Sequence, residues 1–335
     1  MGKLDAAKSI ASEELMNEET AYKLFQYMMR RHSIAPESLA FLLDTAESFH
    51  PQRRRAYQAG LLMQTFSEAA ALAKACKWNG VVVLRDGEVF VDHDGALLQV
   101  EPDARLFRKH GISQAAPMIT ELHELRIEPR TVLDLGANVG EIAVYLSYHL
   151  PNARVVAFEP APENLASFER NLALQREPLR NLELIREAVS DRSGQIEFTI
   201  GAGSLNTAIV ADNLERLQKH KAKVVSVPTD TLFNYCEKLG IDEIDFMKVD
   251  VEGGEPLLSD SISRMPGRIH AAFVEISRYN TVPAYLEMVA AFDRAGLAMV
   301  DHKTPIADPE DWIRTRLAVG PALNVWFVRT DHLPA

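Results

Sequence analysis

The chain has 335 residues, and its 47% hydrophobic, 7% aromatic and 25% charged residues describe an ordinary globular protein of about two structural units, which excludes collagenous, disordered and disulfide-stapled classes. A formal net charge of -11 argues against a nucleic-acid partner, because nonspecific affinity for phosphates comes mainly from lysine and arginine. The two cysteines have no C-x-x-C spacing and no apolar stretch approaches the roughly 18 residues of a membrane span, so we expect a cytoplasmic protein without a membrane span or a structural zinc site.

Residues 1–77 carry the pattern of an N-terminal helical region. Three helices are predicted, over 15–31, 36–46 and 51–76, because Pro36 and Pro51 stand where a first helical turn tolerates a missing N–H. The third segment is apolar around more than one face, so it requires burial on more than one side. Two explanations stay open: a homodimer formed through these helices, or packing of the third helix against the rest of the chain.

Residues 78–112 are predicted to form a small strand-rich connector. The apolar runs 81–84 and 89–91 flank the turn-forming pair Asp86-Gly87, which predicts a β-hairpin. A second such pair, Asp94-Gly95, leads into the run 96–100. We therefore expect short paired strands between the helical region and a larger domain over residues 113–335.

Beyond Pro129, short apolar strands alternate with amphipathic helices, which is typical of a parallel sheet covered on both faces. One helix is predicted to begin at Pro162, and another to end at Gly296. The stretch 190–240 is too long for a simple connection, so we expect an insertion with strands near 195–200 and 223–227. The predicted core strands are 131–135, 154–159, 182–186, 244–249, 270–276, 297–300 and 324–328.

The strongest local signal is the segment 134–140, which reads DLGANVG and joins an apolar strand to a helix. A glycine-rich turn in this place lets a ligand approach the backbone at the carboxyl edge of the sheet. Glu159 ends the next strand, 19 residues after Gly140, which is the usual distance for an acid that accepts hydrogen bonds from ribose hydroxyls. The pattern predicts a site for an adenosine-containing cofactor.

Two cofactors, NAD and S-adenosylmethionine, bind to sites with this arrangement of a glycine-rich turn and an acid. The nicotinamide fingerprint G-x-G-x-x-G brings a pyrophosphate onto a helix N-terminus through three glycines. Here the strand ends instead in Asp134, within the pattern D-x-G-x-N-x-G. A carboxylate in that position would repel a pyrophosphate but attract the cationic ammonium group of S-adenosylmethionine, which favours the second cofactor.

A second signal is the acidic segment 248–255, which reads KVDVEGGE and follows an apolar strand. Since parallel strands end at one edge, we expect Asp250 and Glu252 near the reactive end of the cofactor, with Glu275 at the end of the adjacent strand. These three are the candidate catalytic residues, while Lys248 could instead polarise an acceptor. A structural capping role for one acid of this segment also stays open.

These segments together resemble the FkbM family of methyltransferases. The matching segments are 132–140 (VLDLGANVG), 157–160 (AFEP), 188–191 (AVSD), 248–255 (KVDVEGGE) and 274–275 (VE). The resemblance implies a Rossmann-like class I methyltransferase fold, a seven-stranded and mostly parallel α/β sheet with helices on both faces. It also implies O-methylation of a hydroxyl group on a sugar, a glycan or a natural product. The expected cofactor-binding residues are Asp134, Gly136, Ala137, Asn138, Gly140, Glu159, Pro160, Ala188 and Asp250.

The chemistry of such a transfer sets what the acids must do. A hydroxyl group is a poor nucleophile, so a carboxylate base or a bound divalent cation would help to remove its proton, and the sequence does not decide between the two. The segment 203–207 suits either a loop that closes over the cofactor or a surface turn. Two other classes stay open, an NAD-dependent oxidoreductase and a noncatalytic assembly protein on a methyltransferase fold.

Overall fold

The computed structural model describes residues 81–85, 88–93, 96–100, 112–200, 207–209, 223–320 and 322–333. The chain divides into two units, Met1–Ser113 and Gln114–Ala335. The predicted helices of residues 1–77, with the homodimer left open for them, and positions 203–206 of the segment interpreted as a closing loop or a surface turn lie outside the described residues. None of the described helices is both long and apolar enough to cross a membrane.

The described part of the first unit is a three-stranded antiparallel sheet in the order β1-β2-β3. The strands are β1 (Val81–Arg85), β2 (Glu88–His93) and β3 (Ala96–Val100). Arg85 pairs with Glu88, so that only two residues connect β1 to β2. The hairpin predicted from the Asp-Gly pair is therefore confirmed, and so is the third strand that follows it.

The second unit is built on an eight-stranded sheet in the order β14-β13-β15-β12-β11-β4-β5-β6. The five strands from β12 to β6 run parallel, and β15 is antiparallel to both β12 and β13. All seven predicted core strands are present, and the short β14 is added at the edge, which confirms the predicted Rossmann-like class I fold. The strands are β4 (Thr131–Leu135), β5 (Arg154–Phe158), β6 (Leu182–Ile185), β11 (Ile244–Val249), β12 (Ile269–Ser277), β13 (Leu297–Asp301), β14 (Thr304–Pro305) and β15 (Ala322–Arg329).

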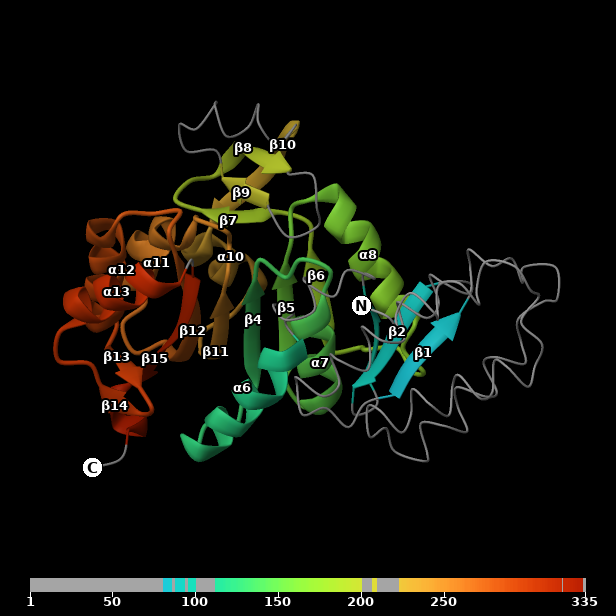
Figure 1. The fold of residues 1–335 in the computed structure, drawn as a ribbon, viewed down its shortest axis with the longest axis horizontal. Coiled ribbons are helices and arrows are strands. Elements are labelled where there is room, and N and C mark those ends of the chain that lie inside the picture. Colours follow the sequence, from blue (N-terminus) through green and yellow to red (C-terminus); the bar gives the residue numbers. More distant parts are fainter. Residues whose placement is uncertain are drawn as a thin grey trace, which may run out of the picture. The chain divides into compact units, whose positions relative to one another are not determined.

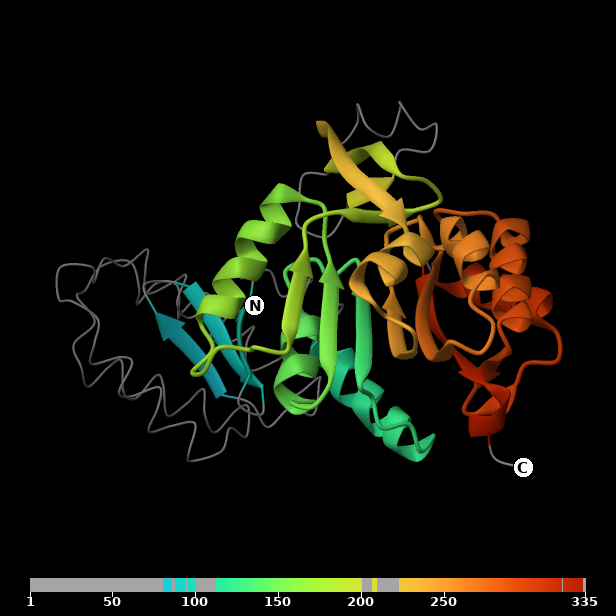
Figure 2. The same ribbon diagram turned by 180° about the vertical axis from the view of Figure 1, so that it is seen from behind.

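Helices cover both faces of this sheet (Figures 1 and 2). One face carries α7 (Glu141–His149) and α8 (Pro162–Ala173), and α6 (Ile112–Glu124) precedes the first strand. The opposite face buries the apolar side chains of the remaining α-helices in the main core. They are α10 (Leu232–Leu239), α11 (Ser259–Ser263), α12 (Val282–Arg294) and α13 (Pro309–Val319), accompanied by the 3-10 turns η2 (Glu255–Leu258) and η3 (Thr330–His332).

Local sequence explains where these helices begin. Proline occupies the first turn of α8, α12 and α13, where its missing N–H costs no helical hydrogen bond. Side chains cap three helices: Thr231 Oγ1 accepts from the N–H of Asn234 at 3.1 Å, and Thr281 and Asp308 do the same for α12 and α13. Capping therefore fixes the entry of the chain into α10, α12 and α13.

At the centre of the sheet, charged residues interrupt one of the two buried faces of β4 and β11. Leu133 and Leu135 of β4 lie in the main core with α10 to α13, as do Met247 and Val249 of β11. Because successive strand residues point to opposite faces, the residues between them face the side covered by α7 and α8. Those residues are Asp134 and Lys248, and the register of β4 and β11 pairs them directly.

The insertion after β6 forms a separate four-stranded sheet in the order β7-β10-β8-β9. Its strands are β7 (Ala188–Ser190), β8 (Gly194–Ile200), β9 (Thr207–Ile209) and β10 (Lys223–Thr231). Phe198 and Val227 from this sheet pack with Ala161 and Ala188, so the small sheet rests on the loop that follows β5. Both strands predicted in the insertion are confirmed, and β7 and β9 extend the sheet.

Candidate functional site

The glycine-rich turn after β4 is held against the neighbouring strands β5 and β11. The N–H groups of Gly136 and Ala137 both donate to the carbonyl of Phe158, at 3.0 and 2.9 Å. Gly136 has a φ of 80°, and a Cβ atom there would lie 1.9 Å from the carbonyl oxygen of Asp250. Gly140 has a φ of 85°, and a Cβ atom there would strike the ring of Phe168 at 2.2 Å. Only glycine fits either position.

Glu159 ties this turn to the end of β5. Its Oε2 accepts from the N–H of Asn138 at 2.8 Å, and its Oε1 accepts from the N–H of Ala161 at 2.8 Å and from Nδ2 of Asn164 at 3.2 Å. The residue is 2% exposed, and burial raises the pKa of its carboxyl group to about 7 against the pull of these donors. The acid predicted to bind a ribose therefore also positions the turn beside it.

Asp134 and Lys248 form a buried ion pair next to the turn. The Lys248 Nζ lies 3.5 Å from Oδ1 of Asp134 and 3.3 Å from Oδ2 of Asp250, and it donates to the carbonyl oxygen of Gly136 at 2.9 Å. The side chain of Asp134 is fully buried and that of Lys248 is 6% exposed. Burial lowers the pKa of Lys248, but the carboxylates of Asp250 and Asp134 outweigh it and hold this pKa above its ordinary value.

Three of the predicted acids meet at the ends of β11 and β12. Asp250 follows β11, and its side chain is 29% exposed. Burial, together with the charges of Asp250, Glu275 and Glu255, raises the pKa of Glu252 to about 9. Glu252 also has a φ of 52°, which is uncommon for a residue with a side chain. The structure thus places Asp250, Glu252 and Glu275 in one electrostatic cluster, as the sequence predicted.

Glu255 differs from its acidic neighbours because it serves the backbone. Its Oε1 accepts from the N–H groups of Val251 and Gly253, both at 3.1 Å, and the residue is 1% exposed. Asn280 holds the same turn from the loop after β12, since its Nδ2 donates to the carbonyl of Gly253 at 2.8 Å. The structural role left open for one acid of this segment therefore belongs to Glu255, and Asn280 was not predicted from the sequence.

The buried acceptor oxygens at the carboxyl edge of the sheet suit a ligand that supplies hydrogen-bond donors. Within the described part of the chain, Oδ1 and Oδ2 of Asp134 and Oδ1 of Asn138 are buried without a hydrogen-bond donor. Asn138 has a φ of 52°, so a second residue with a side chain takes a left-handed conformation here. Ribose hydroxyls and an ammonium group are such donors, so S-adenosylmethionine is chemically suited to these residues.

The other predicted cofactor residues lie around the same turn. Ala137 and Gly140 belong to it, Pro160 follows Glu159, and Ala188 packs with Ala161 on the loop after β5. The carbonyl of Ala188 accepts from the hydroxyl of Tyr235 at 3.1 Å, which fixes its backbone. Their contacts with a cofactor stay predictions, and so does the contact of Asp134 with an ammonium group, because that carboxylate is enclosed beside Lys248.

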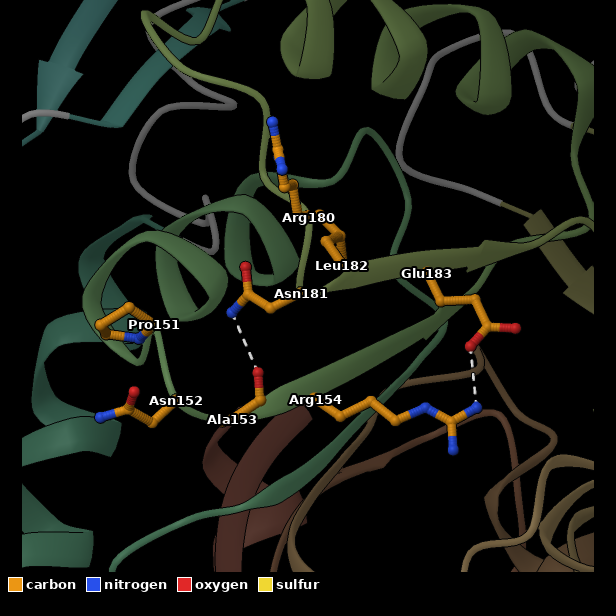
Figure 3. Close-up of a pocket in the computed structure, with 8 residues that line it drawn as sticks. All are labelled: Pro151, Asn152, Ala153, Arg154, Arg180, Asn181, Leu182 and Glu183. Atoms are coloured by element: carbon orange, nitrogen blue, oxygen red, sulfur yellow. Dashed lines mark hydrogen bonds and ion pairs between the residues drawn. The ribbon is translucent and has the colours of Figure 1, made fainter.

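A surface hollow of about 400 Å³ lies elsewhere, at the amino ends of β5 and β6 (Figure 3). Three of its polar side chains are engaged within the protein: Asn181 donates to the carbonyl of Ala153 at 3.0 Å, and Arg154 pairs with Glu183 at 2.9 Å. Ligands of open α/β sheets bind at the opposite, carboxyl ends of the strands. We therefore place the site at the glycine turn rather than in this hollow.

No group of three or more histidine, cysteine, aspartate or glutamate side chains is arranged to hold a metal ion in the part of the chain that the structure describes. The question of metal assistance that the sequence left open therefore gains no support from a coordination site in these residues.

Comparison with known proteins identifies the segment that carries this site. Residues 134–280 match the family described as "Methyltransferase FkbM domain". This chain contains an FkbM methyltransferase domain. The domain holds the glycine turn, Glu159, the acidic segment and Glu275, and the family resemblance expected from the sequence is confirmed.

Two curated relatives of the FkbM domain are methyltransferases by name. The 2-O-methyltransferase NoeI of Sinorhizobium fredii is 29% identical over 134 residues, which cover 37% of this chain and 54% of NoeI. The methyltransferase sdnD of Sordaria araneosa is 27% identical over 148 residues, which cover 37% of this chain and 57% of sdnD. The chain thus spans about half the length of the curated relatives it matches.

Among solved structures, a methyltransferase FkbM from Methylobacillus flagellatus KT is similar over 60% of this chain and 44% of that chain, with 15% identity and a TM-score of 0.36. At this level of similarity, the assignment of the fold rests on the strand order of the sheet itself.

Proposed function

We propose that the protein is an S-adenosylmethionine-dependent methyltransferase that methylates a hydroxyl oxygen of a sugar, a glycan or a natural product. The observation that carries the proposal is the contact between the two halves of the site: the glycine turn of the FkbM domain lies directly against the backbone of Asp250, at the start of the acidic cluster. A cofactor on the turn and an acceptor beside the acids would then be neighbours.

The residues around the turn would hold the cofactor. Glu159 would accept from ribose hydroxyls, since each carboxylate oxygen can accept more than one hydrogen bond, and the buried Oδ1 of Asn138 offers a further acceptor. When bound, S-adenosylmethionine supplies an electrophilic methyl group on a positively charged sulfur. Asp134 and Asp250, two aspartates beside the ammonium group of Lys248, support a preference for a cation.

The acidic cluster would orient the acceptor and remove the proton from its hydroxyl group. Asp250 has a side chain that is 29% exposed and lies beside the turn, so it is the candidate general base that takes the proton from the acceptor hydroxyl. Glu252 and Glu275 are candidates for orienting the acceptor, because hydroxyl groups can donate to one and accept from the protonated form of the other. The name of NoeI, a 2-O-methyltransferase, supports oxygen as the methylated atom.

Calorimetry separates this proposal from the NAD-dependent alternative. We expect S-adenosylhomocysteine to bind and NADH not to bind, and a screen of sugars, glycans and polyketide-type alcohols with methyl-labelled S-adenosylmethionine to transfer label to a hydroxyl. Binding of NADH alone would reverse the assignment. A chain that binds neither ligand would support the noncatalytic alternative.

The role of Asp250 gives the first prediction. We expect Asp250→Asn to lower kcat by about 10² or more, because the amide cannot take up the proton of the acceptor, while S-adenosylhomocysteine still binds. The matched control is Asp260→Asn on α11, whose side chain is 80% exposed in a surface pair with Arg264. Unchanged turnover in Asp250→Asn would remove Asp250 from the mechanism.

A further inference from the structure

Lys248 joins three parts of the site that come from different segments of the chain. An ammonium group has three donors, and the Nζ of Lys248 has three oxygen neighbours: Gly136 O at 2.9 Å, Asp250 Oδ2 at 3.3 Å and Asp134 Oδ1 at 3.5 Å. With its side chain 6% exposed and its Nζ donating to the carbonyl of Gly136, Lys248 is poorly placed to polarise an acceptor. Its contacts suit a different role.

The position of Asp250 depends on this contact more than on any other. Its backbone is fixed, because its N–H donates to the carbonyl of Leu135 at 3.0 Å. Among the described residues, Lys248 is the one partner with which the Asp250 side chain forms an ion pair. The same ammonium group holds the carbonyl of Gly136, and the backbones of Gly136 and Asp250 are already in contact. One side chain thereby links the cofactor turn to the proposed base.

We propose that Lys248 is a positioning residue, which fixes the carboxylate of Asp250 and the carbonyl of Gly136 in one arrangement and so aligns acceptor and cofactor. This inference rests on the proposed function. Asp134 completes the arrangement from the adjacent strand, where it is paired directly with Lys248 and balances its charge. Alignment of this kind matters because small misplacements of reacting groups slow a transfer strongly.

The test replaces Lys248 by methionine, which keeps the length of the side chain and removes the ammonium group. We expect Lys248→Met to weaken binding of S-adenosylhomocysteine at least tenfold, and the crystal structure of that complex to show the Asp250 carboxylate turned away from its present place. Lys248→Arg, which keeps the charge, should recover part of the affinity. If Lys248→Met does not fold because Asp134 is left buried and unpaired, the double variant Lys248→Met/Asp134→Asn is compared with Asp134→Asn alone.

Lys238→Met is the matched control. Lys238 also pairs with a buried carboxylate, that of Asp230 at 2.5 Å, but this pair lies on α10 and β10 and touches neither the turn nor Asp250. We expect Lys238→Met to bind S-adenosylhomocysteine like the unmodified chain.

The outcomes separate this inference from the proposed function. If the unmodified chain does not bind S-adenosylhomocysteine, the proposed function fails and the inference fails with it. If the unmodified chain binds and the folded Lys248 variant binds equally well with Asp250 in place, only the positioning role is overturned. With an acceptor from the labelled screen, Lys248→Met should lower kcat far less in an Asp250→Asn background than alone, because the residue acts through Asp250.

Discussion

At the scale of single residues, Glu252 contributes an unusual pH dependence to stability. Its pKa rises from an ordinary value of 4.5 to about 9 in the folded protein. A carboxyl group with a raised folded pKa stabilises the fold fully below pH 4.5, and this contribution is lost as the pH rises towards 9. The loss amounts to about 1.4 kcal/mol for each pH unit in that window.

We therefore expect Glu252→Gln to unfold at higher denaturant concentration than the unmodified chain near pH 8, with the difference shrinking towards pH 5. The amide keeps the shape of the neutral acid and has no proton to lose. Urea unfolding from pH 5 to 9 measures the difference, and subtraction removes the slopes that Glu159 and Glu255 add to both proteins. Glu243→Gln, at an exposed position, is the control. A difference that does not change with pH would contradict the shift.

Which residues gather at the site could be predicted, but not which of them pair with each other. Parallel strands end at one edge, so the sequence placed Asp134, Glu159, Asp250 and Glu275 together. The pairing of Lys248 with Asp134 depends on the register between β4 and β11, which lie more than a hundred residues apart in the chain, and no local pattern encodes it. Asn280 was missed for the same reason, because its partner Gly253 lies in another loop. Asn164 was missed although its partner Glu159 is only five residues away.

At the scale of elements, the glycine turn is where the backbones after β4 and β11 approach each other closely. An alanine at 136 would be strained by the φ of 80°. Its Cβ would also lie 1.9 Å from the backbone oxygen of Asp250, and a methyl side chain has no rotamer that avoids this clash. We expect Gly136→Ala to lower the free energy of unfolding by about 2–4 kcal/mol and to abolish binding of S-adenosylhomocysteine. Urea unfolding and calorimetry measure the two effects.

Gly240 provides the matched control for that substitution. It ends α10 with a φ of 62°, and a Cβ atom there would meet nothing within 4 Å. Gly240→Ala should therefore show the cost of the left-handed conformation alone, about 1 kcal/mol, and leave binding intact. Equal losses in the two variants would mean that the contact with Asp250 is not what requires glycine at 136.

Elements with a strong hydrophobic period were predicted well, and elements without one were missed. The bounds of β4 and β11 agree with the prediction to the residue, because both are mostly apolar strands buried on two sides. The helix α13 escaped prediction because Ile313 is its one fully buried side chain among mostly polar neighbours. The three-residue strand β7 is too short to show any period and exists through its pairing with β10.

At the scale of the whole molecule, the strand order accounts for the place of the site. The first strand of the domain, β4, lies in the centre with β5 and β6 on one side and β11 and β12 on the other. The chain reverses direction across the sheet at β4, and the turn that follows β4 lies at this switch point, where open α/β sheets bind their ligands. The small sheet then packs on the loop after β5, so the insertion borders the cofactor half of the site.

The position of the site within the chain leads to the last prediction. Every contact that shapes the glycine turn and the acidic cluster in the described residues comes from the FkbM domain and the segments next to it in sequence. We therefore expect a chain that lacks residues 1–77 to bind S-adenosylhomocysteine with unchanged affinity, measured by calorimetry. Light scattering on the same protein tests whether these residues form a homodimer: a fall from the dimer mass to the monomer mass supports a dimer formed through the removed residues, and an unchanged mass class contradicts it. Loss of binding with the fold intact would show instead that the removed residues complete the site.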